Sequence, residues 1–168
     1  MASTVVPAGV LAVLLLAGCA KSAPPAGKAI TVEQVCGEPD GSRVRLTGYV
    51  RYRRGLLSFC SNYGGKRTCD LALYATPEAP PDWNPMRPRT GPEPLHARLS
   101  VPVGSQPGEM AELPEKFSSS DVRVHLPNDA TAPEGGHVTI DGKLSVIPST
   151  DPAAAKQCFV NVEWAGPA

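Results

Sequence analysis

Residues 43–54 (RVRLTGYVRYRR) decide the fold, because their polar and apolar side chains alternate without interruption. One set consists of Arg43, Arg45, Thr47, Tyr49, Arg51 and Arg53, and the other of Val44, Leu46, Gly48, Val50 and Tyr52. Successive side chains of a β-strand lie on opposite faces of a sheet, so the pattern predicts a strand with one buried side and one solvent-facing side. Gly48, within the apolar set, indicates a bend, a bulge or the close approach of another backbone.

Further strand and helix signals follow along the chain. The longer predicted strands are residues 56–60, 69–75, 136–147 (GHVTIDGKLSVI) and 158–164 (CFVNVEW), and shorter ones are predicted at 95–103 and 122–126. Pro102 is expected to keep the 95–103 strand at a sheet edge. Residues 31–35 predict one helical turn, with Thr31 as N-cap and Gln34 three residues later.

Residues 76–94 contain seven prolines. Proline lacks the backbone N–H that strands and helix interiors need, so this density predicts a long loop insertion. Trp83 lies in its middle, and the sequence does not decide whether it anchors the loop or contacts a partner.

Residues 138–142 (VTIDG) repeat residues 44–48 (VRLTG) in apolar, polar and glycine character. Two strands of the form V-x-[L/I]-x-G, each after a glycine-containing turn, resemble the first and fourth strands of OB-fold barrels. The resemblance implies an all-β class and a small OB-like barrel with the Pro-rich loop as an insertion. Its five strands would be 43–54, 56–60, 69–75, 136–147 and 158–164. A β-sandwich is the alternative.

The first 18 residues contain no charged side chain and include the apolar run 10–16 (VLAVLLL). This run is shorter than the roughly 20 residues that a membrane-spanning helix needs, and it is typical of a signal peptide. Leu16-Ala17-Gly18-Cys19 resembles the lipobox of bacterial lipoproteins. The resemblance implies a signal peptide at 1–18, lipidation of Cys19 and attachment to a membrane. An ordinary secretory peptide with an incidental cysteine is the alternative.

Residues 19–30 are small, polar and Pro-rich, and predict a flexible tether in front of a single β domain at 31–168. Because Ala20 rather than aspartate follows Cys19, the lipoprotein resemblance implies the outer membrane, facing the periplasm, if the host is Gram-negative. The predicted location is therefore the cell envelope.

Four cysteines follow Cys19: Cys36, Cys60, Cys69 and Cys158. An even number in an exported domain predicts two disulfides, with three possible connectivities. Residues 61–68 (SNYGGKRT) have turn chemistry, which favours a Cys60–Cys69 bond and leaves Cys36 for Cys158. His96, His125 and His137 are available to a metal, but no C-x-x-C or H-x-x-x-H spacing occurs, so neither a metal nor a cofactor is predicted.

Charge is balanced over the whole chain, with sixteen basic and sixteen acidic residues, but not locally. Residues 43–67 hold seven basic side chains and no acidic one. Arg43, Arg45, Tyr49, Arg51 and Arg53 are therefore a candidate binding face for an anionic glycan or lipid headgroup. The alternative is a solvated strand face whose arginines pair with acids such as Asp70, Glu112 or Glu115. Export argues against nucleic acid as the ligand.

No catalytic motif is present: there is no G-x-S-x-G, P-loop, G-x-G-x-x-G or H-E-x-x-H. The sequence thus predicts a non-enzymatic, membrane-anchored envelope lipoprotein that binds an anionic glycan, a lipid headgroup or an envelope protein. The alternative is an envelope enzyme whose residues converge only in three dimensions.

Overall fold

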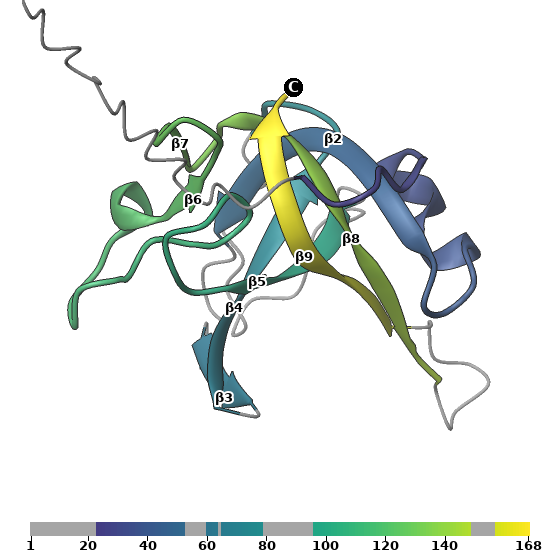
Figure 1. Cartoon of the computed structure of the whole chain (residues 1–168), viewed down its shortest axis with the longest axis horizontal. Coiled ribbons are helices and arrows are strands. Elements are labelled where there is room, and N and C mark those ends of the chain that lie inside the picture. Colours follow the sequence, from purple (N-terminus) through teal and green to yellow (C-terminus); the bar gives the residue numbers. More distant parts are fainter. Residues whose placement is uncertain (1–22, 53–59, 64, 79–95, 149–156) are drawn as a thin grey trace, which may run out of the picture.

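The computed structural model describes residues 23–52, 60–63, 65–78, 96–148 and 157–168 (Figure 1). Its strands are β1 (Lys28–Ala29), β2 (Arg43–Tyr52), β3 (Cys60–Tyr63), β4 (Lys66–Tyr74), β5 (His96–Pro102), β6 (Arg123–His125), β7 (Thr131–Pro133), β8 (His137–Ile147) and β9 (Gln157–Pro167). Two short 3₁₀ helices are η1 (Val32–Gly37) and η2 (Ser119–Asp121). Within these ranges no helix has the length and apolar character needed to cross a membrane. The predicted all-β class is confirmed.

Five strands close into a barrel in the order β2, β8, β9, β5, β4 and back to β2 (Figure 1). The neighbours are antiparallel except β5 and β9, which are parallel. β1 adds to β2, and β3 forms a hairpin with β4. The small OB-like barrel is confirmed, and the alternative of a β-sandwich is wrong because the β2–β4 pairing closes the sheet into one barrel.

The core fills the interior of the barrel and follows the sequence alternation. On β2 the side chains of Val44, Leu46 and Val50 are fully buried, whereas Arg43 and Arg45 on the other side are partly exposed. The largest fully buried side chains also come from the other barrel strands, as in Leu71, Leu73, Leu99, Ile140 and Leu144. Each such side chain contributes about 1.5–3 kcal/mol by leaving water.

Two glycines at matching places in β2 and β8 allow neighbouring backbones to come close. A Cβ added at Gly48 would lie 2.5 Å from the carbonyl oxygen of Tyr74, and one added at Gly142 would lie 2.4 Å from that of Asn161. The β8–β9 register also shifts between Asp141 and Gly142. The close approach predicted at Gly48 is therefore present, and Gly142 has the same role.

Gly48→Ala and Gly142→Ala are each expected to lower the free energy of unfolding by about 1–3 kcal/mol, because the new methyl group must displace a backbone carbonyl. Urea denaturation of the two variants measures this. Gly37→Ala is the matched control, since a Cβ there meets nothing within 4 Å. A loss in the control as large as that in the strand variants would contradict the explanation.

The structure corrects the assignment of the second and third barrel strands. Counted along the chain, the second barrel strand is β4, which the sequence predicts as the third. The third is β5, which the sequence predicts at a sheet edge. β5 pairs with β4 on one side and β9 on the other, and Pro102 lies at its end, where a missing N–H is tolerated.

The predicted strand 56–60 lies outside the described residues except for Cys60, which begins β3. The Pro-rich segment 76–94 thus joins the second and third barrel strands; residues 79–94, with Trp83, are not described.

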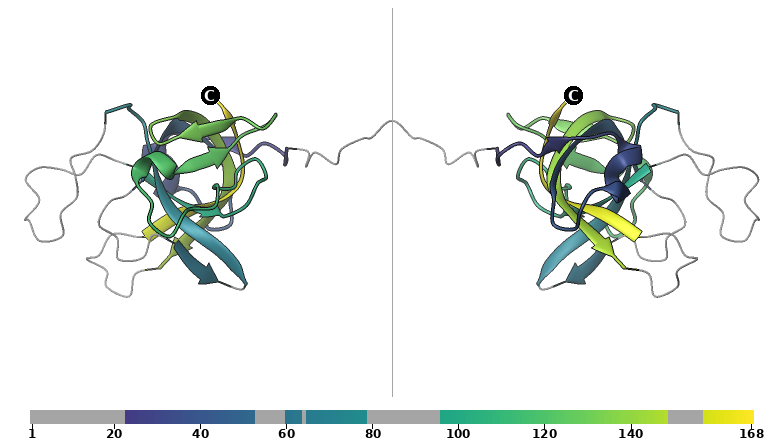
Figure 2. Two further views of the ribbon diagram at one scale, coloured as in Figure 1. Left: turned by 90° about the vertical axis from the view of Figure 1, so that its left-hand side faces the viewer. Right: turned by 90° about the vertical axis from the view of Figure 1, so that its right-hand side faces the viewer.

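Two different segments cover opposite sides of the barrel, as the two views of Figure 2 show. On one side lies η1, where the N–H of Thr31 donates to Oε1 of Gln34 at 3.0 Å and Val32 and Val35 enter the core. The predicted helical turn is confirmed as a 3₁₀ helix. On the other side lies the β6–β7 hairpin within the long connection from β5 to β8, which contributes buried residues such as Met110 to the core.

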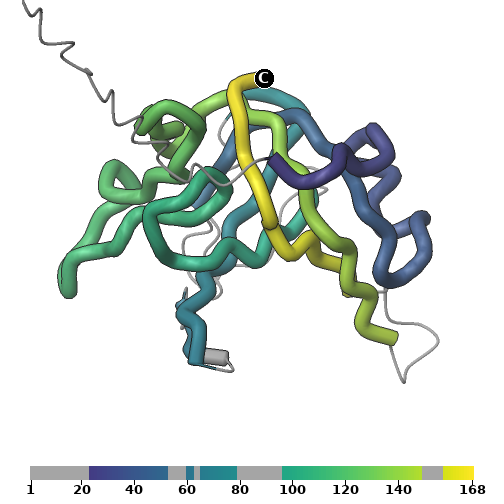
Figure 3. The backbone as a smooth tube through the Cα atoms, in the orientation of Figure 1, coloured from purple at the N-terminus to yellow at the C-terminus, as the bar shows by residue number. Residues whose placement is uncertain are grey.

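The end of the predicted tether belongs to the barrel. Lys28 and Ala29 form β1, which runs parallel to β2 opposite Val44 and Arg45 (Figure 3). A two-residue strand leaves no pattern in a sequence, so the predicted tether boundary at residue 30 is placed too late. The signal peptide at 1–18 and Cys19 lie outside the described residues.

Candidate functional site

The candidate site is the outward side of β2, which we call the β2 face and which comprises Arg43, Arg45, Thr47, Tyr49 and Arg51. Its neighbours on β8 are set by the antiparallel register: Lys143, Asp141, Thr139 and His137 lie opposite the first four of these residues in that order. On the other side, β4 places Tyr74 opposite Tyr49 and Ala72 opposite Arg51. Arg53, the fifth predicted ligand residue, is not among the described residues.

Arg45 is held by a buried carboxylate. Its Nε and Nη2 atoms donate to Oδ2 of Asp141 at 2.9 and 2.7 Å. The Asp141 side chain is 1% exposed, and it is the only buried charged residue in the described part of the chain. The hydrogen bonds that Arg45 donates to Asp141, together with the negative charge of that carboxylate, raise the pKa of the Arg45 guanidinium above its ordinary value. The positive charge of Arg45 therefore neutralises the buried carboxylate of Asp141 in the barrel wall.

Arg43 also has an acidic partner. Its Nη2 lies 2.6 Å from Oε2 of Glu163, a residue of β9, and both side chains are more than one-third exposed. Exposed pairs of this kind contribute about 0–1 kcal/mol. At this end of the β2 face the arginines pair with acids, as the alternative to a binding face predicts. The acids are Asp141 and Glu163, however, and not Asp70, Glu112 or Glu115.

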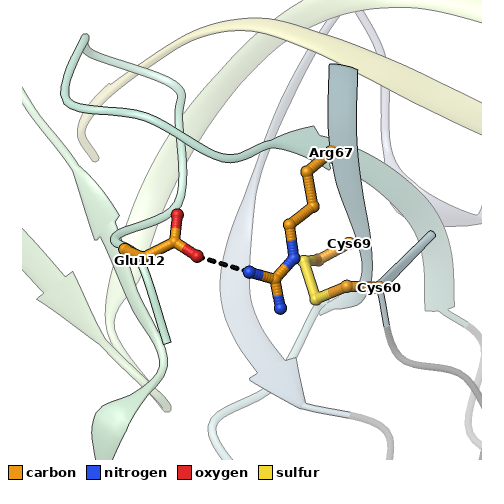
Figure 4. Close-up of a disulfide and its surroundings, with 4 residues drawn as sticks. All are labelled: Cys60, Arg67, Cys69 and Glu112. Atoms are coloured by element: carbon orange, nitrogen blue, oxygen red, sulfur yellow. Dashed lines mark hydrogen bonds and ion pairs between the residues drawn. A yellow bond between two sulfur atoms is a disulfide. The ribbon is translucent and has the colours of Figure 1, made fainter. Parts of the chain in front are cut away.

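Two of the acids expected as partners are used elsewhere. Asp70 on β4 lies 3.3 Å from Arg98 of β5, and Glu112 pairs with Arg67 of β4 (Figure 4). Arg67 belongs to the β3–β4 hairpin and joins it to the long connection between β5 and β8. The sequence identifies Asp70 and Glu112 as acids that pair with arginines, but it could not show with which ones, because the partners depend on how the strands and loops are arranged.

The Tyr49–Arg51 end of the β2 face carries a row of rings across four strands. The ring of Tyr49 stacks on that of His137 with centroids 4.5 Å apart, and the ring of Tyr74 stacks on that of His96 at 5.2 Å. One step away, the hydroxyls of Thr47 and Thr139 are 3.1 Å apart. Only Tyr49 was predicted as a site residue, because the three other rings reach this row through pairings that the sequence does not display.

Arg51 differs from Arg43 and Arg45. Its Nη2 donates to the backbone carbonyl of Pro77, and its guanidinium lies close to Gly135. Its Nε, like that of Arg43, is buried without a hydrogen-bond partner. No acidic residue in the described ranges forms an ion pair with it, so its charge is uncompensated by those residues.

The cysteine pairs follow the connectivity that the sequence favours. Cys60 and Cys69 lie directly opposite each other on β3 and β4, with their Cα atoms 4.0 Å apart, and form a disulfide (Figure 4). Cys36 of η1 is bonded to Cys158 of β9, with 5.6 Å between the Cα atoms. The first bond closes the hairpin, and the second ties the start of the domain to its last strand.

No three His, Cys, Asp or Glu side chains are grouped to hold a metal ion in the part of the chain that the structure describes. Searches of protein-family models and of curated proteins find no match to this chain.

Proposed function

We propose that this protein is a lipid-anchored module of the bacterial cell envelope, without catalytic activity, which binds an anionic envelope ligand through its barrel. One observation carries the anchoring: the four cysteines after Cys19 are joined in two disulfides. Disulfides persist in oxidising compartments, which supports export. Of the five cysteines, Cys19 alone is outside these bonds, and it ends the lipobox-like sequence Leu16-Ala17-Gly18-Cys19.

A lipid on Cys19 would attach the barrel to a membrane. One acyl chain gives marginal, reversible binding, whereas two chains give stable anchoring. With Ala20 after the cysteine, we propose the periplasmic side of the outer membrane as the location in a Gram-negative host. A Cys19→Ser variant should leave the membrane fraction.

We place the binding site at the Tyr49–Arg51 end of the β2 face. Two contacts support this choice over the Arg43–Arg45 end. Arg43 and Arg45 already pair with Glu163 and Asp141, while Arg51 has only a backbone carbonyl as its described partner. The stacked rings of Tyr49 and His137 provide an aromatic surface one step from Arg51. The chemistry fits the phosphate or carboxylate group of an anionic glycan or lipid headgroup, and an acidic envelope protein is the remaining alternative.

Arg51→Glu is expected to weaken binding to an anionic ligand about tenfold or more, because a charge-assisted hydrogen bond is replaced by repulsion. The probes are phosphatidylglycerol vesicles, with phosphatidylcholine vesicles as reference, and soluble dextran sulfate. Vesicle binding alone indicates a headgroup, and dextran sulfate binding alone indicates a glycan. Both should weaken as salt rises, since exposed charges are screened within about 8 Å at physiological ionic strength.

The matched control is Lys66→Glu, which makes the same charge change at an exposed residue of the β3–β4 hairpin. Melting temperatures of both variants show whether the barrel is intact. If Arg51→Glu and Lys66→Glu weaken binding equally, the contact is a general charge effect and the proposed site is wrong. If neither probe binds the wild-type protein, the anionic-ligand proposal fails.

A further inference from the structure

Residues 27–30, which we call the N-terminal arm, are fixed to the barrel by their backbone. The N–H of Gly27 donates to Oδ1 of Asp141 at 2.8 Å, and the N–H of Ile30 donates to the carbonyl of Arg45 at 3.1 Å. Between these two bonds, β1 pairs with Val44 and Arg45 of β2. The arm thus lies along β2 (Figure 3), and Asp141 of β8 lies at its start.

Gly27 allows this close contact. A Cβ added there would lie 2.5 Å from the carbonyl carbon of Val44, so any side chain would push the start of the arm away from β2. The adjacent Lys28 pairs with Glu38 at 2.7 Å, a contact that connects the arm to the residue after η1. Within η1, the disulfide from Cys36 to Cys158 attaches the chain covalently to β9.

Asp141 is the point where the arm, β2 and β8 meet. Its carboxylate accepts bonds from both Arg45 and Gly27, and it is buried. A buried carboxylate is tolerated only when it is paired and hydrogen-bonded, and Arg45 supplies the opposite charge. The bond to Gly27 is therefore made by a carboxylate whose position is already fixed, so Asp141 can hold the arm in one place.

We propose that Asp141, positioned by Arg45, is a latch that holds the N-terminal arm on the barrel and thereby sets the distance and orientation of the barrel relative to the membrane. The inference rests on the proposed function, because it takes Cys19 as the lipid-bearing residue. With the latch closed, the first fixed point is Gly27, eight residues after Cys19, and the reach of the chain between them is at most about 28 Å. With the latch open and residues 27–30 released, the next fixed point is the buried Val32 of η1, thirteen residues after Cys19, and the limit rises to about 46 Å.

Amide hydrogen exchange on the full protein in detergent tests the latch itself. In the wild type, the amides of residues 27 and 30 should be protected. In Gly27→Ala, which displaces the arm and leaves the Asp141–Arg45 pair, both should exchange about tenfold faster or more, while Leu46 and Ile140 amides in the barrel are unchanged. Asp141→Ala should give the same increase at residues 27 and 30.

Glu163→Gln is the control, since it removes the neighbouring ion pair with Arg43, and the Glu163 side chain forms no ion pair with residues 27–30. It should leave the exchange of residues 27 and 30 as in the wild type. Fast exchange of these two amides in the wild type, or slow exchange in Gly27→Ala, would overturn the latch. If Asp141→Ala also speeds exchange of the Leu46 and Ile140 amides, the substitution has loosened the barrel itself. The exchange of residues 27 and 30 in Gly27→Ala then tests the latch.

Neutron reflectometry on supported bilayers separates the latch from the anchor. A lipidated wild-type protein should form a layer close to the bilayer, and Gly27→Ala should form a layer whose centre lies farther out. If the protein carries no lipid, it forms no layer and the proposed anchoring fails, while the exchange result still stands. Layers at equal distance for both proteins would show that the arm does not set the position of the barrel.

Discussion

Replacing Cys36 and Cys158 together by serine is expected to lower the free energy of unfolding by about 4.9 kcal/mol. The two cysteines are 122 residues apart, and the loop-entropy estimate for a bond that closes so long a loop gives this magnitude. Domains of this size are stable by only about 5–15 kcal/mol, so the variant should stand at the limit of folding. Urea denaturation under non-reducing conditions measures the loss.

The Cys60→Ser, Cys69→Ser double variant is the comparison. Its bond spans nine residues, and the same estimate gives about 2.6 kcal/mol. The hairpin it closes is also held by the β3–β4 pairing, so the barrel should remain folded. Equal losses in the two double variants, or a greater loss from the hairpin bond, would contradict the view that the long disulfide is the main covalent constraint.

Cys19→Ser is expected to abolish acylation completely, because the hydroxyl cannot replace the thiol that accepts the lipid. Cells labelled with an alkyne fatty acid should show a strong signal for the wild type and none for the variant, and the variant should be absent from the washed membrane fraction. The Cys60→Ser, Cys69→Ser double variant, whose barrel should remain folded, is the control for loss of cysteines in general and should keep its label. Labelling of Cys19→Ser as strong as wild type would end the lipid-anchor proposal.

The barrel could be predicted because β2 and β8 show the strand pattern in their own residues, without reference to the strands beside them. Alternation over β2, and the glycine that β2 and β8 share at the same place, depend on local geometry. The order of strands two and three could not be predicted. β5 is buried on its apolar side like any barrel strand, but a Pro-rich segment precedes it and Pro102 ends it, and both features are typical of an edge.

The candidate site was predictable only in part, because period-two alternation identifies a face and not its partners. It placed Arg43, Arg45, Tyr49 and Arg51 on one side of β2. It did not show that Asp141 lies opposite Arg45, since that register depends on which strands are adjacent. Nor did it show that Glu163 pairs with Arg43, because Glu163 lies on β9, which is separated from β2 by β8. Arg43 and Arg45 therefore looked like ligand residues in the sequence, and the structure gives them acidic partners.

Mass spectrometry of the mature protein, purified from membranes and digested without reduction, tests the central claim most directly. The account predicts a first peptide that begins at Cys19 and carries acyl chains, together with one peptide pair joined through Cys36 and Cys158 and another through Cys60 and Cys69. A first peptide that begins elsewhere, with Cys19 unmodified or bonded to another cysteine, would contradict it.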